Sequence, residues 1–444
     1  MAARTHVLII VQNLPVPLDR RVWLECRALT ARGYDVSVIC PKGPGDPGRE
    51  TIDGVRIYKY RPAPEASGLL GYLLEFVYCW IRTALLSRVV WRRSPFQVLQ
   101  ACNPPDTYWA LARIWKPRGV RFVFDQHDLN PELYLSRFGR PTGIAGRLQL
   151  GGLRWLERMT YRTADHVIAT NESYKRIAIE RGGLDPADVT VVRSGPDTRV
   201  MRPIHSSVSP TRHSLVYLGI MGPQDGVDTI LDVMDELVHR RGRTDVEATL
   251  LGFGDCLKDL QRRSVELGLE DVVTFTGRAD SAMIAEHLSA ATLGLCPDLK
   301  TPLNDVSTMN KTMEYMAYAL PSVSFDLVET RVSGGDSCLY VRSGDTPAFA
   351  DAVELLLDDS SLRVDMAVRA RRRVCEVLDW RPQAEAYVGV HGLVSGRADH
   401  DLARRADLSP SDPPGQEYVD VDSEDSLRQF VAARDPFLSQ EAAS

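Results

Sequence analysis

The stretch STMNKTMEYMAYALPSVSFD, residues 307–326, reads as a buried helix that leads directly into a buried strand. Methionines recur in it at helical spacing, and Pro321 ends the helix before the apolar run Ser322–Phe325. A helix followed so closely by a buried strand is a unit of a parallel α/β sheet. Lys311 and Glu314 nevertheless lie near the helix start, where packing in an apolar domain does not require charge.

The same alternation of strand and helix runs through most of the chain. Short runs rich in Val and Ile are apolar on both faces, as in HVLIIV and DHVIAT, and longer amphipathic stretches separate them. Parallel strands with crossover helices produce this pattern, because helices then cover both faces of the sheet. The expected strands are 6–11, 36–40, 55–60, 98–101, 122–124, 166–170, 215–218, 246–251, 272–275, 293–296, 322–325 and 339–341. The sequence therefore predicts an α/β protein with doubly wound, Rossmann-like sheets.

A break in this alternation divides the chain into two halves. The segment TRVMRPIHSSVSPTRHS contains Pro and Ser without periodicity, which is typical of a linker. Towards its end the chain becomes acidic and loses apolar periodicity, which favours disorder. We expect an N-terminal domain over 1–198, a linker over 199–214, a C-terminal domain over 215–378, a final helix over 379–396 and a disordered acidic tail over 397–444.

The composition is that of a soluble globular protein. The 444 residues are 44% hydrophobic and 25% charged, and a net charge of -6 without any basic run argues against a nucleic acid partner. The eight cysteines form no Cys-x-x-Cys pair, and most fall inside expected strands or helices, as in proteins of a reducing compartment. The apolar stretch HVLIIV is too short for a signal peptide. We therefore expect a cytoplasmic protein.

The start of the helix after Ser307 has the features of an anion site. Ser307 can cap this helix, whose first free amides would then belong to Thr308 through Lys311. Free amides and the positive end of the helix dipole attract an anion, which the Lys311 ammonium can also reach. Glu314, one turn further on, could accept hydrogen bonds from sugar hydroxyls, so the segment suits a nucleoside diphosphate. The alternative is an exposed Lys311–Glu314 ion pair, worth about 0.2–0.5 kcal/mol.

Six segments, in the right order, resemble the retaining GT-B glycosyltransferases of family 4. They are FDQHDLNPE, VVRSGPDT, YLGIMGPQDGVDTIL, LLGFGDCLKDLQRRSVELGLEDVVTFTG, NKTMEYMAYALPSVSFD and DWRPQAEAYVGVHGL. The resemblance covers most of residues 5–395. It implies an acceptor domain followed by a nucleotide-sugar donor domain, with the helix over 379–396 crossing back to the first. It also implies transfer with retention and no need for a metal or a cofactor.

Residue by residue, the resemblance assigns a donor site and three catalytic positions. The catalytic positions are His127, Lys311 and Glu314. The donor-binding positions are Gly219, Gly222, Gly254, Gly277, Arg278, Asp305, Ser307, Thr308, Met309 and Asn310.

The chain departs from the family pattern at two points. Family members usually show Glu-x7-Glu, and Val306 stands here in place of the first Glu, so that Asp305 or Asn304 would have to serve the sugar. The loop GIMGPQDG carries Met221 and Asp225 where the family often has basic residues. Lys311, the helix amides and Arg278 would then have to neutralise the charge of the donor phosphates.

The N-terminal domain offers two further candidates. Asp19, Arg20 and Arg21 cluster at the start of the first helix, where they could contact an acceptor or phosphate. Alternatively, Asp19 caps the helix and the arginines are solvated. His127 follows a strand end, and as a neutral imidazole it would position the donor sugar rather than attack it.

Two other features concern metals and membranes. His127, Asp128 and Glu132 lack metal-ligand spacing, and no His-Glu-x-x-His pattern occurs, so we expect no metal. Residues 68–93 are apolar and aromatic, but charged side chains interrupt them too often for a membrane span. They could lie on the inner face of a membrane, although packing on the sheet is the plainer interpretation.

The sequence therefore predicts a retaining, metal-independent glycosyltransferase of bacterial polysaccharide or glycoconjugate synthesis. It would move a sugar from a nucleoside diphosphate to a hydroxyl of a sugar, lipid-linked or small-molecule acceptor. Two alternatives are a sugar-nucleotide 2-epimerase of the same architecture and a nucleotide-sugar-binding subunit without catalysis.

Overall fold

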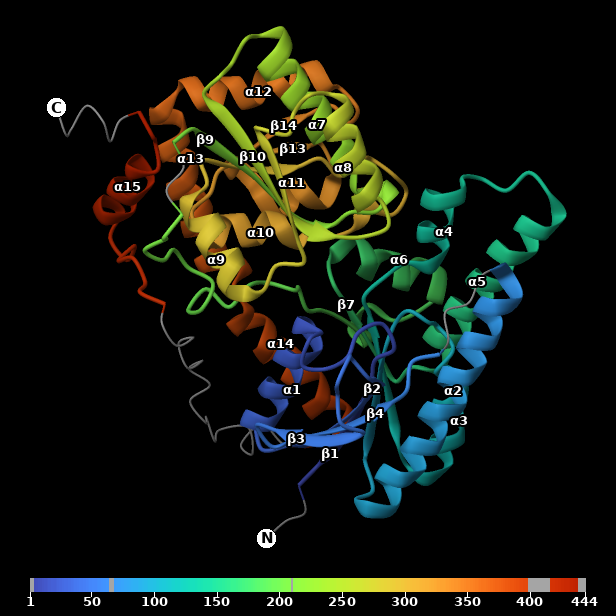
Figure 1. Cartoon of the computed structure of the whole chain (residues 1–444). Helices are drawn as coiled ribbons and strands as arrows, with labels where there is room; N and C mark the ends of the chain where they lie inside the picture. The colour runs from blue at the N-terminus through green and yellow to red at the C-terminus, as the bar shows by residue number, and fades with distance from the viewer. Residues whose placement is uncertain (1–3, 64–67, 209–210, 398–415, 438–444) are drawn as a thin grey trace. The chain divides into compact units, whose positions relative to one another are not determined.

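The computed structural model describes residues 4–63, 68–208, 211–397 and 416–437 (Figure 1). The chain forms two compact units. Unit 1 comprises Met1–Ser194 and Arg381–Ser409, and unit 2 comprises Gly195–Trp380 and Pro410–Ser444. No helix in the described ranges combines the length and the hydropathy that crossing a membrane requires.

Unit 1 is built on an eight-stranded sheet with the order β3-β4-β2-β1-β5-β6-β7-β8. Its strands are β1 (His6–Ile10), β2 (Asp35–Pro41), β3 (Arg49–Ile52), β4 (Val55–Tyr60), β5 (Val98–Cys102), β6 (Arg121–Gln126), β7 (His166–Ala169) and β8 (Val189–Val191). Every pairing is parallel except that of β3 with β4. The strand order reverses between β1 and β5, and in such sheets ligands bind where the order reverses, at the carboxyl ends of the strands.

The helices of unit 1 cover this sheet (Figure 1). They are α1 (Arg20–Ala31), α2 (Gly68–Arg93), α3 (Trp109–Trp115), α4 (Asn130–Phe138), α5 (Ile144–Thr163), α6 (Glu172–Gly182) and α14 (Trp380–Ser395). From Arg381 onward α14 belongs to unit 1, where Tyr387 and His391 both donate to the side-chain oxygen of Gln100 on β5. The final helix is thus anchored to the first sheet by buried hydrogen bonds.

Unit 2 has a six-stranded, all-parallel sheet with the order β11-β10-β9-β12-β13-β14. Its strands are β9 (His213–Ile220), β10 (Val246–Phe253), β11 (Val273–Gly277), β12 (Leu293–Cys296), β13 (Ser322–Phe325) and β14 (Cys338–Val341). Its helices are α7 (Val227–Asp235), α8 (Leu257–Glu266), α9 (Ser281–Ala290), α10 (Asn310–Ala317), α11 (Val328–Gly334), α12 (Thr346–Asp358), α13 (Ser360–Arg373) and α15 (Glu424–Ala433).

Successive residues of β9 are buried in two different hydrophobic cores, one on each face of the sheet. Leu215 and Tyr217 pack with α7 and α12, whereas Val216 and Leu218 pack with α9 and α10. A strand that is covered on both faces must be apolar at every position, which explains the continuous apolar runs of the sequence. The predicted α/β class with two Rossmann-like sheets is confirmed, and each of the twelve expected strands is present within two residues of its predicted ends.

Two strands were not predicted. β3 reads Arg-Glu-Thr-Ile and is half exposed, and β8 has only three residues, so neither shows the apolar run of a covered strand. The segment expected to be a linker instead belongs to unit 2, where the buried Ile204 pairs with Tyr418 in a β-bridge.

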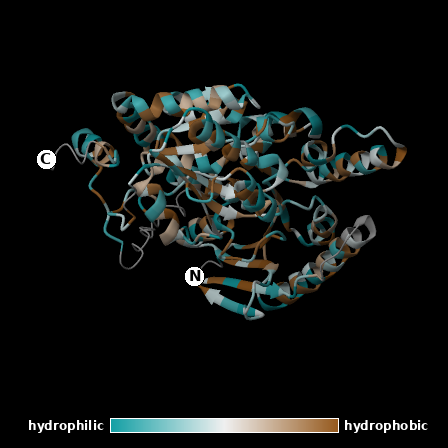
Figure 2. Cartoon of the chain, turned by 45° about the horizontal axis from the view of Figure 1, so that its top comes forward, coloured by the Kyte–Doolittle hydropathy of each residue, from teal (hydrophilic) through white to brown (hydrophobic). Residues whose placement is uncertain are grey.

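The expected disordered tail needs correction for residues 416–437. These residues include α15, which packs on α13 through one apolar face and carries polar residues on the other (Figure 2). Leu427 and Val431 recur at helical spacing among charged residues, so the segment is an amphipathic helix. The acidic composition of the whole tail gave no indication of this helix. The remaining parts of the predicted tail, 398–415 and 438–444, lie outside the described residues.

Candidate functional site

The helix α10 starts close to the carboxyl end of β12, at the reversal of strand order in the second sheet. Its first residue is Asn310 and its N-cap is Met309, which makes no side-chain capping bond. The expectation that Ser307 caps the helix is therefore wrong. The Ser307 hydroxyl donates instead to the carbonyl of Leu303, closing the short turn that precedes the helix.

Lys311 is buried against an acidic partner that the sequence analysis did not identify. Its Nζ lies 2.5 Å from Oδ1 of Asp298 and 5.1 Å from the ring centroid of Tyr217. Burial alone would lower the pKa of Lys311, but the charge of Asp298 more than offsets this effect and raises that pKa. The lysine is therefore a permanent cation. Glu314 is buried as well, so an exposed Lys311–Glu314 ion pair does not describe this helix.

Asp298 lies two residues beyond β12, and the position directly after a strand end was the signal that could have revealed it. Its Oδ2 atom is buried and has no hydrogen-bond partner within the described part of the chain. The carboxylate thus holds Lys311 with one oxygen and keeps an acceptor available on the other.

The predicted donor-site glycines bring the strand-end loops close together. A Cβ atom on Gly219 would lie 3.1 Å from Cε of Lys311, and one on Gly254 would lie 2.6 Å from the carbonyl oxygen of Met221. Gly277 has a positive φ of 70°. The Gly222 amide donates to Asp225 Oδ2 at 2.8 Å, so the carboxylate of this chain already takes the amide that a phosphate could use.

The other predicted donor residues differ in how they are engaged. Arg278 is exposed, and its guanidinium stacks 5.0 Å from the ring centroid of Phe253. Asp305 accepts from the first amide of α11, at Val328, and pairs with Lys300. Asn304 donates to two backbone carbonyls. Both replacements considered for the missing first Glu therefore have structural partners, whereas Arg278 forms no ion pair within the described residues.

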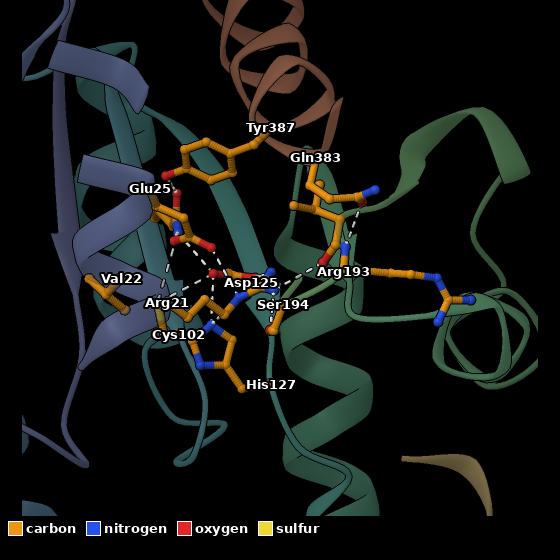
Figure 3. A network of polar contacts seen from close by, with 12 residues as sticks. Arg21, Val22, Glu25, Cys102, Asp125, His127, Arg193, Ser194, Gln383 and Tyr387 are labelled. Atoms are coloured by element: carbon orange, nitrogen blue, oxygen red, sulfur yellow. Dashed lines mark hydrogen bonds and ion pairs between the residues drawn. The ribbon is translucent and has the colours of Figure 1, made fainter. Parts of the chain in front are cut away.

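In unit 1, the three residues Asp19, Arg20 and Arg21 at the start of α1 have different environments. Asp19 is the N-cap and accepts from the amide of Val22, and Arg20 is exposed. Arg21 is buried, so the interpretation of solvated arginines is wrong for it. The Arg21 guanidinium lies 2.9 Å from Oδ1 of Asp125 and 2.8 Å from the Ser194 hydroxyl (Figure 3).

His127 lies at the carboxyl end of β6 and shares the same carboxylate (Figure 3). Its Nε2 is 2.8 Å from Oδ2 of Asp125 and 3.2 Å from Nε of Arg21. This ring nitrogen thus lies between the donor Nε of Arg21 and the carboxylate of Asp125. The tautomer of the ring decides whether Nε2 accepts from Arg21 or donates to Asp125.

Asp125 and Glu25 form a buried acidic pair around one arginine. Burial alone would raise the pKa of Asp125, but the charge of Arg21 and the hydrogen bond with His127 lower it well below its usual range. Burial, together with the charge of Asp125, raises the pKa of Glu25 well above its usual range. Burial thus favours the protonated form of Glu25, and Arg21 favours the ionised form of Asp125. Nε2 of Gln100 donates to both carboxyl groups, at 2.9 and 3.0 Å.

One group of metal-ligating atoms exists in the described residues, and it coincides with this network. Ligand atoms of Cys102, Asp125 and His127 lie within 4.8 Å of one another. A metal ion would have to displace the Arg21 guanidinium from Asp125, and burial raises the pKa of the Cys102 thiol, which keeps it protonated. The residues fit an arginine-centred network better than a metal, and a metal-free protein remains our prediction.

Two family models match the chain, one in each unit. Residues 18–195 match a glycosyl transferase 4-like domain, and residues 212–359 match the glycosyl transferases group 1 domain. The D-inositol 3-phosphate glycosyltransferase of Kineococcus radiotolerans is 27% identical over 86% of this chain and 90% of its own length. The alpha-D-kanosaminyltransferase of Streptomyces kanamyceticus is 33% identical, but the match covers only 36% of this chain and 40% of that enzyme.

Solved structures share the fold at low sequence identity. Sucrose-phosphate synthase from Thermosynechococcus elongatus has a TM-score of 0.71 and 17% identity, with 89% of this chain and 100% of that chain covered. The Anabaena protein HepE in complex with UDP-glucose has a TM-score of 0.65 and 15% identity, covering 88% of this chain and 100% of that one. Two glycosyltransferase domains in this order, each on a Rossmann-like sheet, place the chain in family 4 of the GT-B glycosyltransferases.

Proposed function

We propose that the chain is a retaining glycosyltransferase that uses a nucleoside-diphosphate sugar, with the diphosphate bound at the start of α10. The observation that carries this proposal is the buried, permanently charged Lys311 at a helix start beside the strand reversal of unit 2. A buried cation at a helix start attracts a diphosphate. The complex of HepE, which has a similar fold, contains UDP-glucose.

The reaction needs stabilisation of negative charge on the departing diphosphate. The bond between the sugar C1 and the phosphate oxygen breaks, a bond from C1 to the acceptor oxygen forms on the same face, and the acceptor proton passes to the leaving phosphate. Lys311 and the first amides of α10 are fixed donors for that charge, so the protein itself supplies the stabilisation for which other enzymes use a metal. Asp298 keeps Lys311 in place before the donor arrives.

Glu314 and His127 would act on the hydroxyls of the donor rather than on its phosphates. Glu314 lies one turn after Lys311 on α10, where a carboxylate can accept from ribose hydroxyls. Arg21 and Asp125 engage Nε2 of His127, so Nδ1 is the ring nitrogen that would contact a hydroxyl of the sugar. Neither residue is proposed to attack C1.

We further propose that unit 1 contacts an anionic membrane surface through α2. This helix buries Thr83 and Ser87 on the face that meets α3, where they bond Tyr108 and Trp115. Five of its described apolar residues are instead exposed, with exposed fractions of 39–61%. They are Leu74, Phe76, Val77, Ile81 and Leu85. An apolar stripe beside the exposed Arg82 and Arg88 has the composition of an interfacial helix. Such contact would favour a lipid-linked acceptor.

The test is a transfer assay with the full-length chain. Nucleoside-diphosphate sugars are supplied with lipid-linked and soluble acceptors, release of nucleoside diphosphate is measured, and the anomeric configuration of the product is read by NMR. Product with the donor configuration, formed in the presence of EDTA, is expected. Inverted product, or activity that only magnesium restores, would contradict the proposal.

The same assay separates the alternatives. A 2-epimerase would convert its donor in the absence of any acceptor, whereas a transferase leaves it largely unchanged. A binding subunit would give a ligand-induced rise in melting temperature without turnover. At 100 times its dissociation constant, a ligand adds about 2.7 kcal/mol to the unfolding free energy, enough to identify the preferred nucleotide by thermal shift.

A further inference from the structure

The C-terminal segment 416–437 is an integral part of unit 2. Val421, Leu427 and Val431 are buried in one apolar cluster with Ala319, Ala367 and Val368. Two backbone hydrogen bonds also join the segment to the chain before β9, from His205 N to Glu417 O at 2.8 Å and from Val419 N to Pro203 O at 3.0 Å. The first of the cluster partners, Ala319, directly follows Tyr318, the C-cap of α10.

The end of this segment is fixed by charge as well. Asp435 forms a buried ion pair with Arg363 of α13. Removing one partner of such a pair would leave the other charge buried, so the pair holds the chain end firmly after α15.

Arg434, next to Asp435, reaches the carboxyl end of the donor helix. Its Nη1 donates to the carbonyl of Ala319 at 2.9 Å, and its Nη2 donates to the carbonyl of Tyr318, the C-cap of α10. Arg371 of α13 donates to the carbonyl of Ala317 at 2.7 Å. The last carbonyls of a helix have no partners within it and carry the negative end of its dipole, so two cations stabilise this end.

Besides these carbonyls, the Arg434 guanidinium contacts the ring of Phe430, 4.2 Å from its centroid. Among the described residues, no carboxylate forms an ion pair with Arg434, and burial lowers its pKa to about 9. A guanidinium placed there is costly unless its hydrogen bonds to the carbonyls matter, because it gives up hydration without gaining a counter-ion.

The backbone at Ala319 gives a reason for the contact. Ala319 has a φ of +52°, in the left-handed region that glycine prefers and that costs an alanine energy. Strained conformations of this kind persist only where surrounding contacts hold them. The carbonyl of Ala319 is one of the two groups that Arg434 holds, so α15 fixes the turn between α10 and β13.

We propose that Arg434 is a positioning residue that fixes the carboxyl end of α10 and thereby places Lys311 for the donor diphosphate. The helix is only eight residues long, so a displacement at one end moves the other. This inference rests on the proposed donor site at α10. It makes the C-terminal segment a part of the donor-binding machinery, contributed by residues far from the site in the sequence.

The test compares Arg434→Ala, Arg434→Lys and Arg428→Ala in the full-length chain. Arg428 is a matched control on the same helix, because it pairs with Asp365 and Glu424 on the surface and does not contact α10. Two quantities are measured at a temperature well below every melting point: hydrogen exchange of the amides in 310–320, and kcat and KM for the donor.

We expect Arg434→Ala to speed exchange in 310–320 and to lower kcat/KM for the donor, each by about tenfold, as for the loss of a charged hydrogen bond. Arg434→Lys, which keeps a cation and donors, should restore part of both. Arg428→Ala should change neither. A merely structural role would lower the melting temperature of Arg434→Ala while the folded protein kept its wild-type exchange in 310–320 and its kinetics, and that outcome overturns the proposal.

The exchange measurement needs no donor, so it also separates two kinds of failure. One outcome is a wild type that turns over no nucleotide sugar, with Arg434→Ala still speeding hydrogen exchange in 310–320. In that case the proposed function is wrong, and the stabilisation of α10 by Arg434 is confirmed. If the wild type is active and Arg434→Ala matches it in exchange and kinetics, the positioning role is wrong and the proposed function stands.

Discussion

Oδ2 of Asp125 lies 2.8 Å from Nε2 of His127, while Oδ1 of the same carboxylate holds the buried guanidinium of Arg21. One anion thus orients the imidazole and neutralises the arginine. Because Asp125 lies near the end of strand β6 and Arg21 lies in the first turn of helix α1, the side chain of His127 is held by two elements that are far apart in sequence.

Replacing Asp125 by Asn should impair transfer without weakening nucleotide binding. The imidazole loses the carboxylate that contacts its Nε2 atom, so we expect kcat to fall by about 10- to 100-fold, less than the roughly 10²–10⁴-fold that a positioned acid–base group contributes. Binding of the free nucleoside diphosphate, measured by calorimetry, should stay within about twofold, since that ligand has no sugar. His127→Ala should behave in the same way. A joint loss of nucleotide affinity and thermal stability in His127→Ala would instead make His127 a structural residue.

Replacing Lys311 by Met should lower turnover by about 10²–10³, as for the loss of one donor that stabilises developing charge.

Asp298→Asn is the complementary change. It leaves the Lys311 cation buried without its counter-ion, which should cost about 3–5 kcal/mol of stability in the empty protein. An added nucleoside diphosphate should then raise the melting temperature of Asp298→Asn more than that of the wild type. Equal shifts in the two proteins would show that the phosphates bind away from Lys311.

His391 should make unit 1 sensitive to acid. Burial lowers the pKa of His391 from 6.5 to about 3, so between these values the unfolded chain binds a proton that the folded chain does not. The free energy of unfolding therefore falls as the pH falls through this window, by about 1.4 kcal/mol per pH unit from this group. Relative to His391→Gln, the wild type should lose about 2 kcal/mol between pH 6.5 and pH 5 in denaturant titrations. Parallel profiles for the two proteins would contradict the assignment.

The outward apolar stripe of α2 predicts binding to anionic vesicles. The double variant Ile81→Asp and Leu85→Asp should reduce co-sedimentation with vesicles that contain phosphatidylglycerol by about tenfold or more, because two apolar contacts are lost and two repulsive charges are added. Val265→Asp is the matched control, since Val265 is also exposed but lies in unit 2. Wild-type binding by the double variant would remove α2 from the membrane contact.

The C-terminal segment should be needed for a stable unit 2. Ending the chain after residue 415 removes the apolar face of α15 and leaves Arg363 without Asp435, so we expect a drop in melting temperature of several degrees or loss of folding. This differs from the expectation of a disordered tail over 397–444, whose removal would leave the fold intact. A truncated protein with unchanged melting temperature would restore that earlier view.

The local pattern of the sequence was sufficient for the twelve expected strands and for the family. Runs such as 55–60 and 293–296 are apolar at every position because helices cover both faces of their sheets, so their periodicity alone marks them. Asp19 as N-cap and the break at Pro321 are likewise local effects, set by side chains and backbone within a few residues.

The partners of the charged residues depended on the tertiary structure. Lys311 pairs with Asp298, Arg21 with Asp125, and Arg434 with the end of α10, over separations of 13, 104 and 115 or more residues. A charge has no periodicity, and its partner is decided by which strand ends and helix ends meet, so neither spacing nor composition could reveal these contacts. Burial then separates a solvated arginine such as Arg20 from Arg21, its neighbour in the chain, because only the fold removes one of them from water.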